Sequence, residues 1–142
     1  MNIIFIFAVL SGVAVNDFKV PEDVVLDSTT VQGVFLGYQV GDYIHPILQT
    51  NAGEVLSFWS TDPLMDYFLT CQVGEEVILE IENKESYIPE AGGMMRILSV
   101  VGVSTNTTSF SIWRDSIETL GEPQELLGDY FTAPYNCLVE EW

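Results

Sequence analysis

His45 is the only histidine of the chain, and it stands three residues after Asp42, so these two side chains are the first candidates for metal chemistry. A zinc site needs three or four converging ligands. Residues three apart on a strand point to opposite faces, which separates Asp42 from His45 if the segment is extended. We therefore expect His45 to be a hydrogen-bonding residue at the start of a strand, and we expect no metal at this pair.

Carboxylate pairs are frequent and are the next candidates for chemistry. Acid–base hydrolysis of a glycoside needs two carboxyl groups about 5 to 9.5 Å apart in one cleft, a separation that a sequence does not define. The chain contains neither the Asp-x-Asp-x-Asp-Gly loop of a calcium site nor the Gly-x-Ser-x-Gly turn of a serine nucleophile. We expect a non-catalytic protein without a cofactor. A small hydrolase or a Ca²⁺-binding domain ranks third, after the two binding functions described at the end of this section.

Cys71 and Cys137 are the only cysteines and are 66 residues apart. In an oxidising compartment they form a candidate disulfide, and closing a loop of that length stabilises the fold by about 4 kcal/mol in the chain-entropy model. In a reducing compartment both remain free thiols. The two alternatives depend on where the protein resides.

The charge of the chain excludes several classes of partner. Four Lys and Arg stand against 21 Asp and Glu, for a net charge of −17. Phosphate backbones and anionic membranes are bound through Lys and Arg, so direct nucleic-acid binding is not expected. After Arg114 there is no base, and the acidic field attracts a basic protein. The predicted partner-binding residues lie in this part of the chain: Glu122, Glu125, Asp129, Glu140, Glu141 and Trp142.

The first 15 residues carry no charge and begin with an apolar run that ends in small residues. This pattern is typical of a signal peptide cleaved after Ala14, although no Lys or Arg precedes the apolar run. The run is too short for a transmembrane span. The alternative is a first core strand, because residues 3–10 are rich in β-branched and aromatic side chains. Export to the periplasm or the medium follows from the first alternative, and a cytoplasmic location from the second.

The rest of the chain, residues 16–142, is long enough for one domain. Residues 16–29 have no clear period and are interpreted as a linker or edge segment. Alternation then predicts a strand over 31–40 with Val34, Leu36, Tyr38 and Val40 on one face, followed by a hairpin of strands 43–50 and 54–60. Asp62 and Pro63 begin a short helix that ends near residue 69.

A second group of strands follows the helix. Val77, Leu79 and Ile81 alternate with acids, which predicts a half-buried strand, then a loop over 83–93 and a central strand over 94–103. An acidic extension begins near residue 104 and is predicted to contain a strand at 110–114, a helix at 123–130 and a last strand at 136–140. The clustered aromatic side chains of the first half are expected in the core: Tyr38, Tyr43, Phe58, Trp59, Tyr67 and Phe68.

Three strands, a helix and two strands form the element order of an OB-type barrel. The run from Val31 to His45, with its Gly41-Asp42-Tyr43 turn, followed by the hairpin and Phe58-Trp59, resembles the opening of small OB-like β-domains of uncharacterised exported bacterial proteins. The resemblance covers residues 30–103 and implies an all-β, OB-like small barrel and an exported location. It implies no catalytic residue.

These observations predict an acidic binding module that engages a basic partner protein in the cell envelope or outside the cell. The alternative is a cytosolic acidic inhibitor, a nucleic-acid mimic whose carboxylates replace phosphates on a DNA- or RNA-binding protein. The oligomeric state does not follow from the sequence.

Overall fold

The computed structural model describes residues 19–139 of the 142-residue chain. The predicted signal peptide or first strand at residues 1–15 lies outside the described residues. Glu140, Glu141 and Trp142, three of the predicted partner-binding residues, lie outside them as well.

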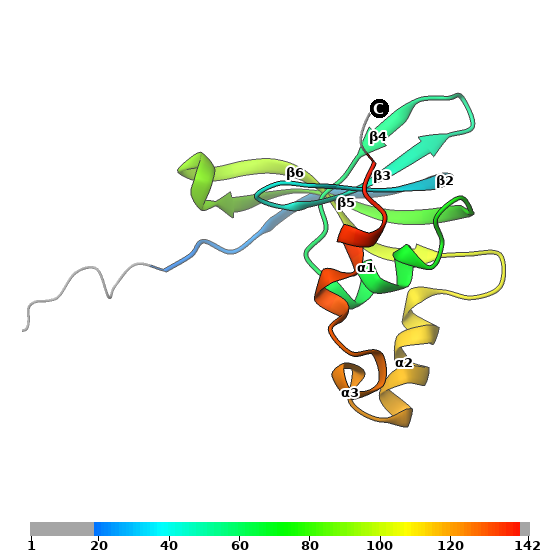
Figure 1. Ribbon diagram of the computed structural model, residues 1–142. Helices are drawn as coiled ribbons and strands as arrows, with labels where there is room; N and C mark the ends of the chain where they lie inside the picture. The colour runs from blue at the N-terminus through cyan, green and yellow to red at the C-terminus, as the bar shows by residue number, and fades with distance from the viewer. Residues whose placement is uncertain (1–18, 140–142) are drawn as a thin grey trace, which may run out of the picture.

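One antiparallel sheet dominates the described chain, in the order β4-β3-β2-β5-β6. Its strands, drawn across the upper half of Figure 1, are β2 (Val24–Val40), β3 (Ile44–Thr50), β4 (Val55–Ser57), β5 (Glu76–Ile88) and β6 (Gly93–Ser104). Helix α1 (Pro63–Thr70) lies between β4 and β5 in the chain and packs below the sheet (Figure 1). The all-β class with short helices and the order of three strands, a helix and two strands are confirmed.

The sheet does not close into a continuous barrel within the described residues. Its two edges approach each other only after β4, where Trp59 forms an isolated parallel bridge with Ser99 of β6. The Trp59 amide donates to the carbonyl of Leu98, and the Val100 amide donates to the carbonyl of Trp59, both at 2.9 Å. The fold is therefore an open sheet whose edges are joined at one bridge.

Strand β2 contains a β-bulge that reverses its alternation. The pairing with β3 shifts between Phe35 and Gly37, and Gly37 has a φ of 132°. As a result Phe35 and Tyr38 both face the core, with no exposed side-chain surface. The predicted face of Val34, Leu36, Tyr38 and Val40 is wrong for its first half, because a bulge inserts one residue and moves the side chains that follow to the other face.

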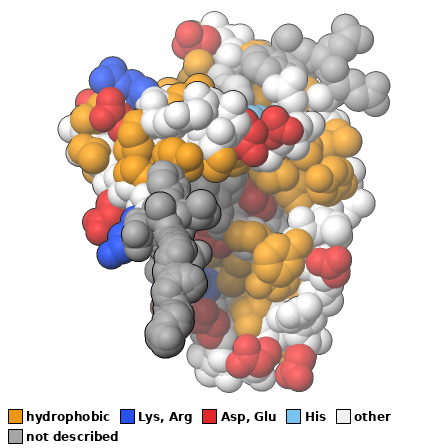
Figure 2. Space-filling view, turned by 90° about the vertical axis from the view of Figure 1, so that its left-hand side faces the viewer, with side chains coloured by type: hydrophobic (Ala, Val, Ile, Leu, Met, Phe, Trp, Pro, Cys, Tyr) orange, Lys and Arg blue, Asp and Glu red, His pale blue; other side chains and the backbone are white. Residues whose placement is uncertain are grey.

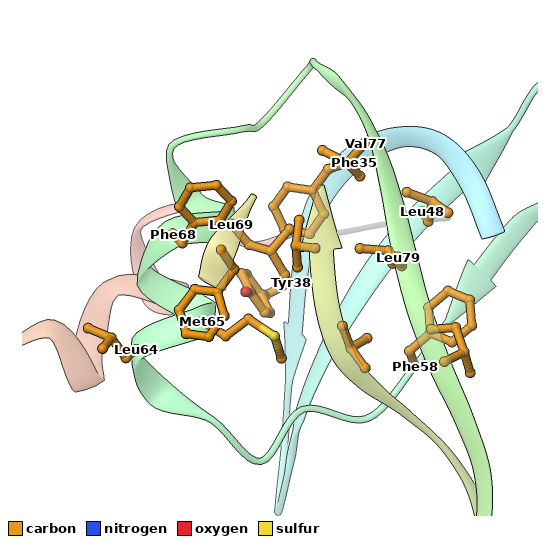
Figure 3. Close-up of a cluster of buried hydrophobic side chains, with 14 residues drawn as sticks. Phe35, Tyr38, Leu48, Phe58, Leu64, Met65, Phe68, Leu69, Val77 and Leu79 are labelled. Atoms are coloured by element: carbon orange, nitrogen blue, oxygen red, sulfur yellow. The ribbon is translucent and has the colours of Figure 1, made fainter. Parts of the chain in front are cut away.

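The core lies between the sheet and α1, and Figure 3 shows the helix side chains pointing toward the strands. Asp62 caps the helix by accepting from the amides of Leu64 and Met65 at 3.1 and 3.2 Å, as its type and position predict. The predicted strand face is confirmed as well, since the other side of the cluster is formed by Val77, Leu79 and Ile81.

The predicted loop at 83–93 is wrong. Strand β5 continues to Ile88, a single turn of 3₁₀-helix, η2 (Pro89–Ala91), reverses the chain, and β6 begins at Gly93. This arm extends away from the helices in Figure 1. Three strands stabilise its base, because Val24, Val25 and Asp27 of β2 pair with Glu85, Lys84 and Asn83. Residues 16–29, interpreted as a linker or edge segment, are strand from Val24 onward. Residues 24–32 pair with β5 and not with β3, which agrees with the edge-segment alternative. Strand β6 is an edge strand of the sheet, not a central one.

The C-terminal extension is helical where a strand was predicted. Ser109 caps α2 (Phe110–Leu120), and Phe110, Trp113 and Ile117 share its inward face at helical spacing. Helix α3 (Pro123–Leu127) is shorter than predicted, and the 3₁₀-helix η3 (Tyr130–Asn136) follows it. The predicted last strand is, in its described part, a single parallel bridge between Leu138 and Tyr38. No helix among residues 19–139 is long and apolar enough to cross a membrane.

Candidate partner-binding surface

The acidic side chains of the extension lie on the solvent side of α2, α3 and the turns that join them. Between residues 115 and 139 the chain contains no Lys and no Arg. All five acids of this segment are exposed: Asp115, Glu118, Glu122, Glu125 and Asp129. The structure thus places three of the predicted partner-binding residues, Glu122, Glu125 and Asp129, on one short stretch of surface chain.

Large apolar side chains are exposed among these acids. Leu120 and Ile112 of α2 are 72% and 64% exposed, and Tyr135 and Phe131 of η3 are 56% and 54% exposed. Leu126 of α3 is exposed as well. In the lower half of Figure 2, where α2 and α3 lie, hydrophobic side chains adjoin acidic ones. The acids are evident from the sequence, but the exposed apolar side chains are not, because their exposure depends on the helical form of residues 110–120.

Aromatic contacts hold α2 against α1. Trp113 stacks on Tyr67 with ring centroids 5.9 Å apart, and Phe110 lies 6.0 Å from Phe68. The guanidinium of Arg114 lies over the Phe110 ring at 5.4 Å, and its Nε is 3.7 Å from the Asp115 carboxylate. These contacts fix the base of α2 and leave its outer face free.

The end of the extension is anchored on β2. The Tyr38 amide donates to the carbonyl of Cys137 at 2.9 Å, and the Val139 amide donates to the carbonyl of Tyr38 at 2.8 Å. Ala133 and Pro134 of η3 are buried. The surface formed by α2, α3 and η3, which we call the acidic face, is therefore attached to the fold at both ends. A pre-formed surface loses little conformational entropy on binding.

Asp66 is a buried acid that sequence reasoning did not single out. It lies on α1 with 4% of its surface exposed, and the Tyr38 hydroxyl donates to its Oδ1 at 2.9 Å. Burial raises the pKa of the Asp66 carboxyl to about 6, against the effect of the Ser60 and Tyr38 hydroxyls, and Asp62 raises it further. Because its burial depends on contacts between α1 and β2, its role is structural.

Asp42 and His45 do not converge. Asp42 is exposed in the turn before β3, and His45 Nδ1 lies 3.0 Å from the carbonyl oxygen of Phe58. The His45 ring meets Trp59 edge-on at 5.0 Å, and Tyr43 covers Trp59 at 4.7 Å. Within residues 19–139 no three His, Cys, Asp or Glu side chains gather as a metal site.

The aromatic side chains expected in the core divide into two groups. Tyr38, Phe58 and Phe68 are buried. Three are half-buried near the surface, namely Tyr43, Trp59 and Tyr67. The Tyr43 hydroxyl donates to the Glu90 carboxylate at the tip of the β5–β6 arm, which ties this arm to the β2–β3 turn.

Both cysteines are free thiols at the ends of neighbouring helices. Cys71 follows α1 and is exposed, and Cys137 follows η3 and is half-buried. Burial raises the pKa of the Cys137 thiol, and the nearby Asp66 and Cys71 raise it further. The two thiols thus lie within electrostatic reach of each other, and a disulfide between them stays a prediction.

The chain matches no protein-family model, no curated protein and no solved structure.

Proposed function

We propose that the protein is a non-catalytic binding module that engages a basic partner protein through the acidic face. The observation that carries the proposal is that exposed apolar side chains of α2, α3 and η3 lie among exposed acids, of which Glu118, Glu122, Glu125 and Asp129 have no basic partner among the described residues. Contiguous exposed apolar surface marks interaction sites in soluble proteins, and a field of one sign selects partners of the opposite sign. The partner that fits is a protein segment with basic and apolar side chains side by side.

The proposal includes export of the protein to the cell envelope or the medium. The uncharged apolar run at the start of the sequence, followed by small residues, supports export, as does the resemblance to OB-like domains of exported bacterial proteins. The basic partner then resides in the cell envelope or outside the cell. No cofactor enters the proposal, because binding through charge and apolar contact needs none.

The proposal is tested by mapping where a basic amphipathic peptide binds. The probe is a helical peptide of Lys and Leu in heptad spacing, and the readout is the change in backbone amide signals on titration. The expected changes centre on residues 110–139. Changes spread evenly over the sheet and the β5–β6 arm would contradict an acidic face with a defined position.

A further inference from the structure

A groove crosses the outer side of the sheet, apart from the acidic face. The groove is open to solvent and has a volume of about 520 Å³. It lies over β2, β5 and β6, which run side by side in Figure 1. Its lining comes from these three strands alone: Ser28, Thr29, Thr30, Glu80, Ile81, Glu82 and Val101. The volume lies within the range of small-ligand sites, about 300 to 1,000 Å³.

The register of the sheet brings hydroxyls and carboxylates together in the groove. Ser28 pairs with Glu82, and Thr30 pairs with Glu80. Directly opposed residues of an antiparallel pair point to the same face. Two cross-strand pairs therefore place hydroxyl and carboxylate side chains on the same face of the sheet.

A glycine makes room for one of these carboxylates. Gly102 pairs with Glu80 across the β5–β6 ladder. A Cβ at Gly102 would lie 2.8 Å from Cδ and 2.9 Å from Oε1 of Glu80. The Glu80 carboxylate thus occupies the space that a side chain on β6 would take.

The protein leaves the Glu80 carboxylate and two hydroxyls of the groove free to bind a ligand, whereas the Glu82 carboxylate already pairs with Lys84. Within residues 19–139 Glu80 makes no ion pair, and the hydroxyls of Ser28 and Thr30 make no hydrogen bond. Lys84 Nζ lies 3.0 Å from Asp23 Oδ2 and 4.0 Å from Glu82 Oε1, so Lys84 pairs more closely with Asp23 than with Glu82. The exposed side chain of Val101 supplies an apolar wall.

We propose that this groove binds an alkylammonium group carried on an aliphatic chain. An ammonium has three donors and no acceptor, which matches carboxylate and hydroxyl oxygens, and its methylene chain lies against Val101. Both a free polyamine and a lysine side chain of a peptide carry this group. Glu80, Val101 and Gly102 also line a neighbouring hollow with Phe110, Ser111 and Arg114 at the start of α2. None of the acids of the acidic face lines the groove, so the proposal does not depend on the function proposed for that face.

The experiment titrates the protein with two probes of equal charge, spermidine and an acetylated, amidated tri-lysine peptide. Binding is followed by backbone amide signals and by calorimetry. The expected changes centre on residues 28–30, 80–82 and 101–102. Tighter binding of spermidine identifies a free polyamine as the ligand, and tighter binding of the peptide identifies a lysine side chain.

Two variants test the groove against a matched control. Glu80→Gln with Glu82→Gln should weaken binding roughly threefold to tenfold, the range for two exposed ion pairs. Glu122→Gln with Glu125→Gln removes the same charge from α3 and should leave the groove signals unchanged. Gly102→Ala keeps every charge, displaces the Glu80 carboxylate and should also weaken binding, with a thermal melt to confirm the fold. Equal losses from the two Glu→Gln double variants, or no change at the groove with either probe, would overturn the proposal.

Discussion

The hydroxyl of Tyr38 on β2 donates a 2.9 Å hydrogen bond to the buried carboxylate of Asp66 on α1. The same tyrosine exchanges backbone hydrogen bonds with Cys137 and Val139 at the end of the extension. One residue of β2 therefore connects the sheet, the core helix and the segment that anchors the acidic face. A change at this point is expected to affect all three.

Asp66 makes stability depend on pH. Its folded pKa of about 6 is raised above the ordinary value of 3.8, so the folded state holds the proton more tightly than the unfolded state. The stabilisation is complete below the unfolded pKa and is lost as pH rises through the folded pKa. The ionisation of Asp66 alone lowers the free energy of unfolding by roughly 2 to 3 kcal/mol between pH 4 and 7, because each pKa unit corresponds to about 1.4 kcal/mol. Chemical denaturation at a series of pH values measures it.

Asp66→Asn is the control for this pH dependence, because it keeps the shape of the side chain and removes its titration. The variant should lose the part of the slope that belongs to Asp66, while the repulsion among surface carboxylates remains in both proteins. A slope identical to that of the unmodified protein would show that Asp66 does not titrate in this range.

Gly37→Ala tests the junction of the bulge with the extension. The added Cβ would lie 2.3 Å from the carbonyl oxygen of Cys137, at a φ of 132° that an L-residue rarely adopts. Gly53→Ala is the matched control, since Gly53 also has a positive φ, 86°, but nothing lies within 4 Å of its Cβ position. We expect Gly53→Ala to cost about 1 kcal/mol and Gly37→Ala clearly more, because the clash adds to the strain. If urea unfolding shows the same loss of stability for both variants, the close approach of the new Cβ to Cys137 is relieved without an energetic cost.

Cys71 and Cys137 should form a disulfide when the protein is equilibrated with oxidised glutathione. The thiolate of one cysteine attacks glutathione disulfide and releases one glutathione, and the second thiolate then displaces the other. The protein loses two hydrogens, about 2 Da, and gains up to about 4 kcal/mol of stability from loop closure. Intact mass before and after reduction measures the bridge. Two glutathione adducts in place of a bridge would contradict the pairing.

Export predicts a second change in mass. Protein recovered from its native cells should lack about the first 14 residues if the apolar run is a cleaved signal peptide. A full-length chain without a bridge would instead favour a first core strand and the cytosolic inhibitor.

Structural features that depend on residues close together in the chain are predicted from the sequence better than strand pairing between distant segments. The alternation of Val77, Leu79 and Ile81 with acids and the cap at Asp62 both follow from neighbouring residues, and both are confirmed. The extension of β5 to Ile88 depends on pairing with β6 across a short turn and with β2, which is distant in the chain, and its polar residues by themselves suggest a loop.

Two further features could not be inferred from local pattern. The bulge between Phe35 and Gly37 changes which side chains are buried. Apart from Gly37 itself, no residue type in this segment predicts a bulge. Residues 110–114 alternate over a window too short to distinguish a strand from a helix. The acids of the candidate surface were found by charge, but its exposed apolar side chains depend on how α2 and η3 are placed.

Charge reversal on the acidic face tests the central claim most directly. The test variant carries three substitutions on the acidic face: Glu122→Lys, Glu125→Lys and Asp129→Lys. The control variant carries three substitutions of equal charge outside this face: Glu54→Lys, Glu75→Lys and Glu85→Lys. Both variants are titrated with the Lys and Leu peptide by calorimetry. Low ionic strength maximises surface electrostatics, and there we expect at least about a tenfold loss of affinity for the first variant and a smaller loss for the control. Unchanged affinity of the first variant at low salt, or an equal loss in the control, would contradict the assignment of the acidic face as the partner-binding surface.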